Sequence, residues 1–587
     1  MTTVDVSGWS DAVDQERLMA HTAAIAQYVR LSGSEDERKA FTYIAEQLES
    51  FGLSTRWHTP TCLVSLPRSG SMTVDGATLE PCITHAFGTS TADGGVSGDV
   101  VYAGRGGLDD LHKANAAGKL ALTDGLATPD KARAASIVGA LGVISISGDQ
   151  LHEMIVSPVW GSPTLETLDD LPTVPLVSIT TAAGQALKEQ LRTGPLRATI
   201  ATTVDTSWQP LPLLLGDLDV DVPDSATGQL RDYVMFSGHV DSWHYGAMDN
   251  GSANATMLET ARILAEQRSQ LRRGVRFAFW SGHSHARYAT SAWFADRYWH
   301  ELAERCVTHV NVDSTGGMNA TLLEEANTVP ETHALAREVI QRQTGQELTY
   351  KRFGRAGDQS FWGVGLSSMF MSLSQQGEPD AVSADQAFLL GGGGSVARGG
   401  GLGWWWHTTE DTLDKVDPAF LTRDTKVYVE VVGRLATDAW LGLDISAAIT
   451  DLQAQVTECA AEWASALTGG DDDSLGFDAL QVDLAALSGA AERLVASAAS
   501  ADEAQQAALS RQIVAALRPL TRVNFTRGGA FAHDPALNQP PLPALRAPQG
   551  FADLAEGERW AAQHGVRRAM NGVRQAVRAS AAALQTA

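Results

Sequence analysis

The sequence contains few cysteines, fewer basic than acidic residues, and no long hydrophobic run. Its four cysteines are too few and too widely spaced for a disulfide framework or a Cys-x-x-Cys zinc site, so we expect reduced thiols. These are Cys62, Cys82, Cys306 and Cys459. Lys and Arg number 44 against 69 Asp and Glu, and the resulting net charge of −25 repels phosphate backbones and anionic lipid. Nucleic acid is therefore not an expected partner.

Segments that would place the chain in or across a membrane are also missing. No run of about 18 apolar residues occurs, and the N-terminal residues have neither a basic leader nor the apolar core of a signal peptide. We therefore expect no membrane partner and a cytoplasmic location.

The 587 residues, 44% of them hydrophobic and 19% charged, have the composition of a globular protein with a large core. Short strands and turns dominate residues 60–206 and predict a separate β-rich unit. From Tyr233 onward the apolar strands YVMFSG, VRFAFWSG and VTHVNVD alternate with helical patterns, which predicts a mainly parallel sheet covered on both faces. We expect an α/β fold with this sheet in residues 1–59 and 207–440, and a helical domain in the Ala- and Leu-rich residues 441–587.

Polar residues with metal-binding side chains follow these strands, where open α/β sheets bind their ligands. His239 and Asp249 lie in GHVDSWHYGAMDNGSA after the first strand, Asp313 lies in VNVDSTGG after the third, and His407 lies downstream in WWWHTTEDTLDKVD. Taken singly, each has an ordinary explanation as a solvated histidine, a helix N-cap or a turn residue. Together they form the imidazole and carboxylate set that zinc or a neighbouring first-row metal prefers.

With these motifs the sequence resembles the zinc aminopeptidase family that includes glutamate carboxypeptidase II and the transferrin receptor ectodomain. The resemblance spans nearly the whole chain and includes the blocks RLSGSEDERKAFTYIAEQLESFGL, GHVDSWHYGAMDNGSA, AGDQSFWGVGL and HTTEDTLDKVD. It implies that residues 60–206 are an inserted protease-associated domain. It also implies that the C-terminal helices form a dimerisation-like domain, so that a homodimer is expected.

In that family two zinc ions share one bridging carboxylate. The matching positions imply that His239 and Asp313 bind one ion, that His407 binds the other, and that Asp249 bridges the two. Asp241 would orient His239 without binding the metal itself, because imidazole ligands commonly need such a partner. Asp358 matches a further family position that supports the site without being a ligand.

One departure from the family pattern affects the expected chemistry. Where the family has two adjacent glutamates, a general base followed by a ligand of the second metal, WSGHSHARYATS has His283 and Ser284. A serine hydroxyl is a poor substitute for a carboxylate, so we expect the second metal to bind weakly or to be absent unless His285 moves in as a ligand. Zinc is the first expectation, and manganese, iron and a count of one or two ions remain open.

Histidine is the residue type that ionises nearest neutral pH, so His283 is the candidate general base, and His285 remains the alternative proton carrier. Trp243 and Trp406 are candidate substrate-binding residues. Trp243 lies in a motif near the site, and at least one of the three consecutive tryptophans at 404–406 should line the pocket or contact a partner subunit, because all three cannot enter one core. The glycine-rich run 391–403 fits either a lid or an ordinary surface loop.

These observations predict a metal-dependent hydrolase that cleaves an amide or other C–N bond in a small molecule or short peptide. The alternatives are aminopeptidase or carboxypeptidase activity on peptides, and a catalytically silent binding protein of the transferrin receptor type.

Overall fold

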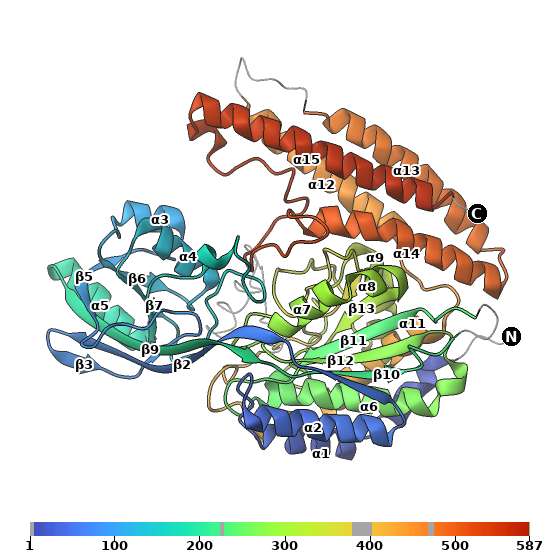
Figure 1. Ribbon diagram of the computed structural model, residues 1–587, viewed down its shortest axis with the longest axis horizontal. Helices are drawn as coiled ribbons and strands as arrows, with labels where there is room; N and C mark the ends of the chain where they lie inside the picture. The colour runs from blue at the N-terminus through green and yellow to red at the C-terminus, as the bar shows by residue number, and fades with distance from the viewer. Residues whose placement is uncertain (1–4, 224–227, 378–401, 468–474, 586–587) are drawn as a thin grey trace.

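The computed structural model describes residues 5–223, 228–377, 402–467 and 475–585 (Figure 1). Two β-sheets and a C-terminal group of long helices build the molecule, so the predicted α/β class with a helical C-terminal region is confirmed. Among the helices of the described residues, none is long and apolar enough to cross a membrane.

The central sheet has six strands in the order β1-β10-β12-β11-β13-β14. Their bounds are β1 (Ser54–His58), β10 (Leu213–Leu218), β11 (Tyr233–His239), β12 (Gly274–Trp280), β13 (Cys306–Asn311) and β14 (Ser368–Met369). The pairs β11–β12, β11–β13 and β13–β14 are parallel, whereas β1 and β10 join antiparallel at one edge. Every residue of β11, β12 and β13 is buried, as expected for strands with helices on both faces.

Helices cover the two faces of this sheet (Figure 1). One face packs against α1 (Gln15–Ala26), α2 (Glu35–Ser50), α6 (Ala253–Glu266) and α11 (Pro418–Thr437), and the other packs against α7 (Ala289–Arg297) and α8 (Trp299–Arg305). Because alternate strand residues point to opposite faces, Phe236 and Phe277 enter the first core whereas Met235 and Ala278 enter the second. The helix α9 (Pro330–Thr344) contacts α11 and β14.

The second sheet has eight strands in the order β3-β2-β9-β5-β6-β7-β8-β4 and lies to one side of the molecule (Figure 1). Its strands are β2 (Thr61–Val74), β3 (Ala77–Leu79), β4 (Cys82–Thr84), β5 (Val96–Tyr102), β6 (Leu120–Asp124), β7 (Gly142–Ile146), β8 (Leu176–Ile179) and β9 (Arg197–Pro210). Its helices are α3 (Leu108–Lys113), α4 (Pro129–Val138) and α5 (Thr181–Thr193). The chain enters this unit along β2 and leaves it along the antiparallel β9, so residues 61–210 form an insertion, called the insert below.

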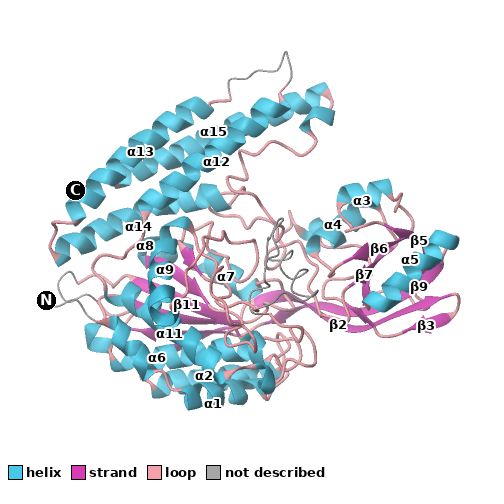
Figure 2. Ribbon diagram, turned by 180° about the vertical axis from the view of Figure 1, so that it is seen from behind, coloured by secondary structure: helices cyan, strands magenta, loops and turns pink. Residues whose placement is uncertain are grey.

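Four long helices form the described C-terminal residues, and they lie beside the central sheet (Figure 2). They are α12 (Ile445–Ala466), α13 (Phe477–Ala498), α14 (Glu503–Phe525) and α15 (Glu556–Ala583). Apolar residues at helical spacing join them, for example Leu480, Leu484 and Leu487 of α13 with Val566 and Met570 of α15. The segment between α14 and α15 returns to the central sheet, where Ala536 and Asn538 line the same pocket as the predicted metal ligands.

Short helical turns complete the described elements. They are η1 (Val6–Ala12), η2 (Leu168–Asp170), η3 (Ala247–Ser252), η4 (Arg268–Gln270), η5 (Leu413–Lys415) and η6 (Phe551–Asp553).

Candidate metal centre and active site

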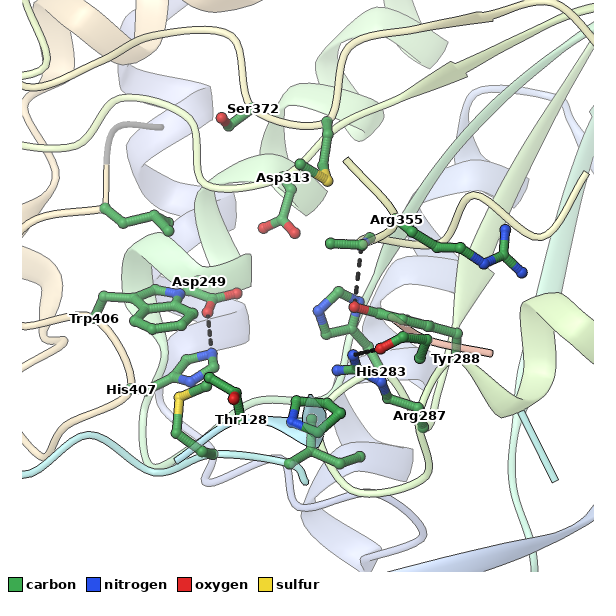
Figure 3. Close-up of a pocket in the computed structure, with 18 of the residues that line it drawn as sticks. Thr128, Asp249, His283, Arg287, Tyr288, Asp313, Arg355, Ser372, Trp406 and His407 are labelled. Carbon is green, nitrogen blue, oxygen red and sulfur yellow. Dashed lines mark hydrogen bonds and ion pairs between the residues drawn. The ribbon is translucent and has the colours of Figure 1, made fainter. Parts of the chain in front are cut away.

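The predicted metal-binding residues converge at the carboxyl ends of the parallel strands. His239 is the last residue of β11, Asp313 follows β13, Asp249 lies in the turn η3 before α6, and His407 lies in a loop before α11. Asp249, Asp313 and His407 line one pocket together with His283 (Figure 3). Segments far apart in the sequence therefore meet at one edge of the sheet.

Asp249 stands between the two predicted histidine ligands. Its Oδ1 lies 3.2 Å from His239 Nε2, and its Oδ2 lies 3.1 Å from His407 Nε2. The Oδ2 of Asp313 lies 3.5 Å from the same His239 Nε2. This is the arrangement expected of a carboxylate that faces two cation positions, with Asp313 at only one of them.

The hydrogen bonds of the two imidazoles test whether a cation fits here. His239 Nδ1 lies 2.9 Å from the backbone carbonyl of Asp241, and His407 Nδ1 lies 2.7 Å from that of Glu153. A carbonyl oxygen only accepts, so both Nδ1 atoms carry the proton. In the neutral rings the Nε2 lone pairs of His239 and His407 then face the oxygens of Asp249, and acceptors that face each other repel unless a cation lies between them.

Two further observations agree with this fit. His239 Nε2 and Asp249 Oδ1 are buried and have no hydrogen-bond partner. Burial opposes a charge on His239, but the carboxylates of Asp313 and Asp249 outweigh burial and raise the pKa of His239 well above its ordinary value. The donor set therefore suits a divalent metal ion with nitrogen and oxygen ligands.

The turn that carries Asp249 is held by two buried residues that the sequence analysis missed. Asp411 accepts hydrogen bonds from the backbone N–H groups of Met248 at 2.9 Å and Asp249 at 3.0 Å. Burial raises the pKa of Asp411 to about 7. Arg30 donates to the carbonyls of Val240, Tyr245 and Gly246, the last two directly before η3. Arg30 lies in the block RLSGSEDERKAFTYIAEQLESFGL and Asp411 in HTTEDTLDKVD, but only the fold shows which groups these two side chains contact.

Asp241 lies beside His239, as expected, and has further contacts that the sequence did not indicate. Its backbone carbonyl orients His239, whereas its carboxylate accepts hydrogen bonds from the N–H groups of Ser284 at 2.8 Å and His283 at 3.2 Å and from Ser32 Oγ at 2.6 Å. Asp241 therefore fixes the turn after β12 on which His283 and Ser284 stand.

His283 has the environment of an oriented base or ligand. Its Nδ1 lies 2.8 Å from Asp358 Oδ2, and Ser291 Oγ donates to the other oxygen of Asp358 at 2.7 Å. Burial opposes ionisation of Asp358, but the charge of His283 and its hydrogen bond lower the pKa of this carboxyl group. The carboxylate thus holds the proton on Nδ1. The His283 ring stacks on that of His239 with centroids 3.8 Å apart, and ligand atoms of His239, His283 and Asp313 lie within 4.8 Å of one another.

His285 lies apart from this cluster. Its Nδ1 is 3.0 Å from Ser32 Oγ, and its fully buried ring packs against Trp243 with centroids 4.1 Å apart. Burial lowers the pKa of His285 to about 3. The ring centroids of Trp243 and His407 lie 5.7 Å apart, so this tryptophan packs against both histidines.

The three consecutive tryptophans have different environments. Trp405 is buried and its indole N–H donates to Met248 Sδ, while Trp404 packs against it and lies near Lys415. Trp406 lines the pocket and stacks on His407 with centroids 3.5 Å apart (Figure 3). The glycine-rich run 391–403 lies outside the described residues except for its last two positions.

The insert also contributes to the site, and the sequence analysis did not predict this. Beyond the bond from His407 Nδ1 to Glu153, the backbone N–H of Glu153 donates to the carbonyl of His407 at 3.0 Å. Met154 and Thr128 of the insert line the pocket. The orientation of His407 therefore depends on the placement of the insert.

Part of the chain matches a known protein family. Residues 220–432 match the model described as peptidase family M28. Aminopeptidase NAALADL1 of Rattus norvegicus is 35% identical over 94 residues, which are 15% of this chain and 12% of that protein. A probable glutamate carboxypeptidase of Zea mays, VP8, is 24% identical over 239 residues, which are 39% of this chain and 32% of that protein. The matched regions thus span less than two thirds of these relatives.

Solved structures with a similar fold cover more of the chain. An aminopeptidase from Aneurinibacillus sp. strain AM-1 aligns with a TM-score of 0.53 and 21% identity over 73% of this chain and 95% of that chain. A zinc aminopeptidase from Bacillus subtilis aligns with a TM-score of 0.53 and 19% identity over 71% and 94%. Residues 220–432 are therefore similar to peptidase family M28, and the chain has the fold of these solved aminopeptidases.

Proposed function

We propose that this protein is a metal-dependent hydrolase that cleaves an amide or related C–N bond of a short peptide or small molecule. The observation that carries the proposal is the pair of imidazole Nε2 atoms, of His239 and His407, that face the two oxygens of Asp249 in one pocket. That arrangement occurs within the region that matches peptidase family M28.

A divalent ion, zinc first and manganese or iron as alternatives with similar ligand preferences, fits His239, Asp249 and Asp313. His407 and the other oxygen of Asp249 offer a second position, where Ser284 replaces the family's carboxylate ligand. We therefore expect one tightly bound ion and a second that binds weakly or not at all. When bound, such an ion polarises the substrate carbonyl and lowers the pKa of a coordinated water toward about 7.

The residues of the chain do the remaining work. His283 accepts the proton of the attacking water at Nε2, because Asp358 keeps the other ring proton on Nδ1 and stabilises the imidazolium that forms. Asp241 holds the turn that carries His283, and Trp406 offers the substrate an apolar face beside His407.

An amide and peptide library, assayed with zinc, manganese and iron, tests the proposal. We expect metal-dependent turnover that is lost in His283→Ala and retained in His285→Ala. If His285→Ala abolishes turnover while His283→Ala does not, the proton carrier is His285. Absence of turnover with every metal would instead support a silent binding protein.

Cleavage of peptides from one end is the second candidate function. It is supported by the names of the matching relatives, an aminopeptidase and a probable glutamate carboxypeptidase. Mass spectrometry of products from peptides blocked at either end distinguishes the two directions.

We also propose that the insert is a protease-associated domain, that the C-terminal helices mediate a homodimer, and that the protein is cytoplasmic. The four free, buried cysteines are compatible with a reducing compartment. Light scattering coupled to size-exclusion chromatography tests the dimer, and a reporter fusion tests the location.

A further inference from the structure

The pocket contains a buried positive charge that the proposed mechanism does not use. Arg287 lines the pocket, and 9% of its surface is exposed. Within the described residues, the one hydrogen bond of its guanidinium goes to the carbonyl of Ala536 at 3.3 Å, and its buried Nε has no partner. An arginine that is buried without a carboxylate is costly for a fold, because the loss of hydration is not repaid.

Arg355, the other arginine of the pocket, provides a contrast. Its Nε donates to the carbonyl of Pro535 at 2.8 Å, and its Nη2 donates to that of Asp534 at 2.6 Å. Its guanidinium also lies over the Trp160 ring at 4.4 Å. Arg355 thus fastens the segment between α14 and α15 to the central domain, whereas Arg287 has N–H groups left for a ligand.

The backbone at Arg287 is held in a conformation that non-glycine residues seldom adopt. Its φ is +50°, and the φ of the following Tyr288 is +68°. Hydrogen bonds keep the turn in place: the N–H of Gly161 donates to the Arg287 carbonyl at 2.6 Å, and the Tyr288 N–H donates to Gly282 at 2.9 Å. Strain of this kind persists where the surrounding structure enforces it, and it is concentrated at ligand sites.

Arg287 lies on the same side of the pocket as His283 and Tyr288, across from His407 and Trp406 (Figure 3). Asp130 of the insert also lines the pocket, and no ion pair joins it to Arg287 among the described residues. Burial raises the pKa of the Asp130 carboxyl, and the charges of Arg287 and Arg133 partly oppose this. Asp130 therefore does not neutralise Arg287 by direct contact.

We propose that Arg287 binds the free C-terminal carboxylate of the substrate, on the far side of the scissile bond from His407. This deepens the proposed hydrolase function and rests on it. The substrate class is then short peptides or N-acyl amino acids with an unblocked C-terminus. The planar guanidinium fork suits a carboxylate because two parallel N–H groups meet its two oxygens.

Matched substrates test the inference. The zinc-loaded full chain is assayed on an N-acetylated dipeptide that ends in phenylalanine, either as the free acid or as the C-terminal amide. We expect kcat/KM to be about 10–100-fold higher for the free acid, which is the usual effect of a hydrogen bond to a charged group. Arg287→Gln is expected to remove this preference, so that kcat/KM for the free acid falls to about that of the amide.

Two controls sharpen the assay. Arg133→Gln removes a charge near Asp130 but leaves Arg287 in place, so this variant should keep the preference for the free acid. A C-terminally amidated peptide that ends in glutamate tests the other carboxylate source. If it is cleaved as well as the free acid and loses this in Arg287→Gln, Arg287 binds a side-chain carboxylate and the assignment to the C-terminus is overturned.

Binding measured without turnover separates this inference from the proposed function. Calorimetric titration with N-acetylphenylalanine should give affinity that its amide lacks, and Arg287→Gln should weaken it about 10–100-fold at unchanged zinc content. If this holds in a protein that cleaves nothing, the hydrolase proposal fails and the carboxylate site stands. If the wild type cleaves acid and amide equally, and Arg287→Gln changes neither binding nor cleavage, the carboxylate site fails and the hydrolase stands. Arg287→Lys, which keeps the charge, should retain part of the affinity, and unchanged circular dichroism excludes misfolding.

Discussion

Replacement of Asp358 by Asn tests whether His283 accepts a proton from a fixed tautomer. His283 Nδ1 lies 2.8 Å from Asp358 Oδ2, in a pair whose side chains are 15% and 2% exposed, so little water screens the contact. An asparagine has nearly the same shape, and its oxygen can still accept from Ser291. Its NH2 group then faces His283 Nδ1, which must accept, so the ring proton moves to Nε2 and blocks the base.

The expected loss follows from that change. General base catalysis contributes about 10²–10⁴ in rate, and a base held in the wrong tautomer loses most of this. We therefore expect kcat to fall about 10²–10⁴-fold in Asp358→Asn, or about 3–5 kcal/mol in the activation free energy, with KM changed less than about threefold. Steady-state kinetics of the zinc-loaded protein measure this.

The matched control is Ser291→Ala, which removes one hydrogen bond to Asp358 but leaves its charge. A lost neutral hydrogen bond costs about 1 kcal/mol, so kcat should fall less than about tenfold. If Asp358→Asn retains kcat within tenfold of the wild type at full metal content, His283 is not the base and this reasoning is refuted.

Three further predictions concern metal content and stability. Asp249→Ala should reduce bound zinc, measured by elemental analysis, well below one ion per chain, because Asp249 faces both imidazoles; unchanged zinc would contradict the site. Arg276→Met should lower the free energy of unfolding in urea by about 3–5 kcal/mol, because the buried carboxylate of Asp217, which Arg276 contacts at 2.7 and 2.9 Å, has then lost its partner. Introducing Asp217→Leu into the same variant should recover much of this loss. Burial raises the pKa of Glu331 above 4.5, so its contribution to stability is present below that pH and is lost as the pH rises through the raised value. Glu331→Gln should remove this loss and become more stable relative to the wild type as the pH rises, and parallel curves for the two proteins would count against the assignment.

Sequence patterns predicted the parts of this molecule that depend on periodicity and chain order. The apolar runs of β11, β12 and β13 are buried throughout, and the residues that follow them reach one pocket because parallel strands end at the same edge of a sheet. His239, Asp249 and Asp313 could therefore be brought together from the sequence, whereas His407 follows no strand directly and was assigned as a ligand by the family resemblance.

Contacts made through the backbone, or between distant segments, could not be predicted in this way. The carbonyl of Glu153 orients His407 from the insert, and any residue at position 153 other than Glu would offer the same carbonyl, so the sequence carries no signal for it. Asp411 likewise acts on backbone N–H groups of η3. Asp241 was expected to orient His239, but the sequence does not indicate that its backbone carbonyl, at 2.9 Å, lies closer to His239 Nδ1 than its carboxylate does, at 3.7 Å.

The hydrogen bonds that the Asp241 carboxylate accepts also explain how the turn after β12 carries His283 and Ser284 at the positions where the resembling family has two glutamates. The carboxylate of Asp241 accepts from the N–H groups of both residues, and these bonds do not depend on the side chains that the two positions carry. The conformation of the turn is therefore preserved while the chemistry that it presents changes from two carboxylates to an imidazole and a hydroxyl. Asp358 then becomes the group on which the new side chain depends, because a neutral imidazole accepts a proton at Nε2 only when its own proton is on Nδ1, where Asp358 holds it.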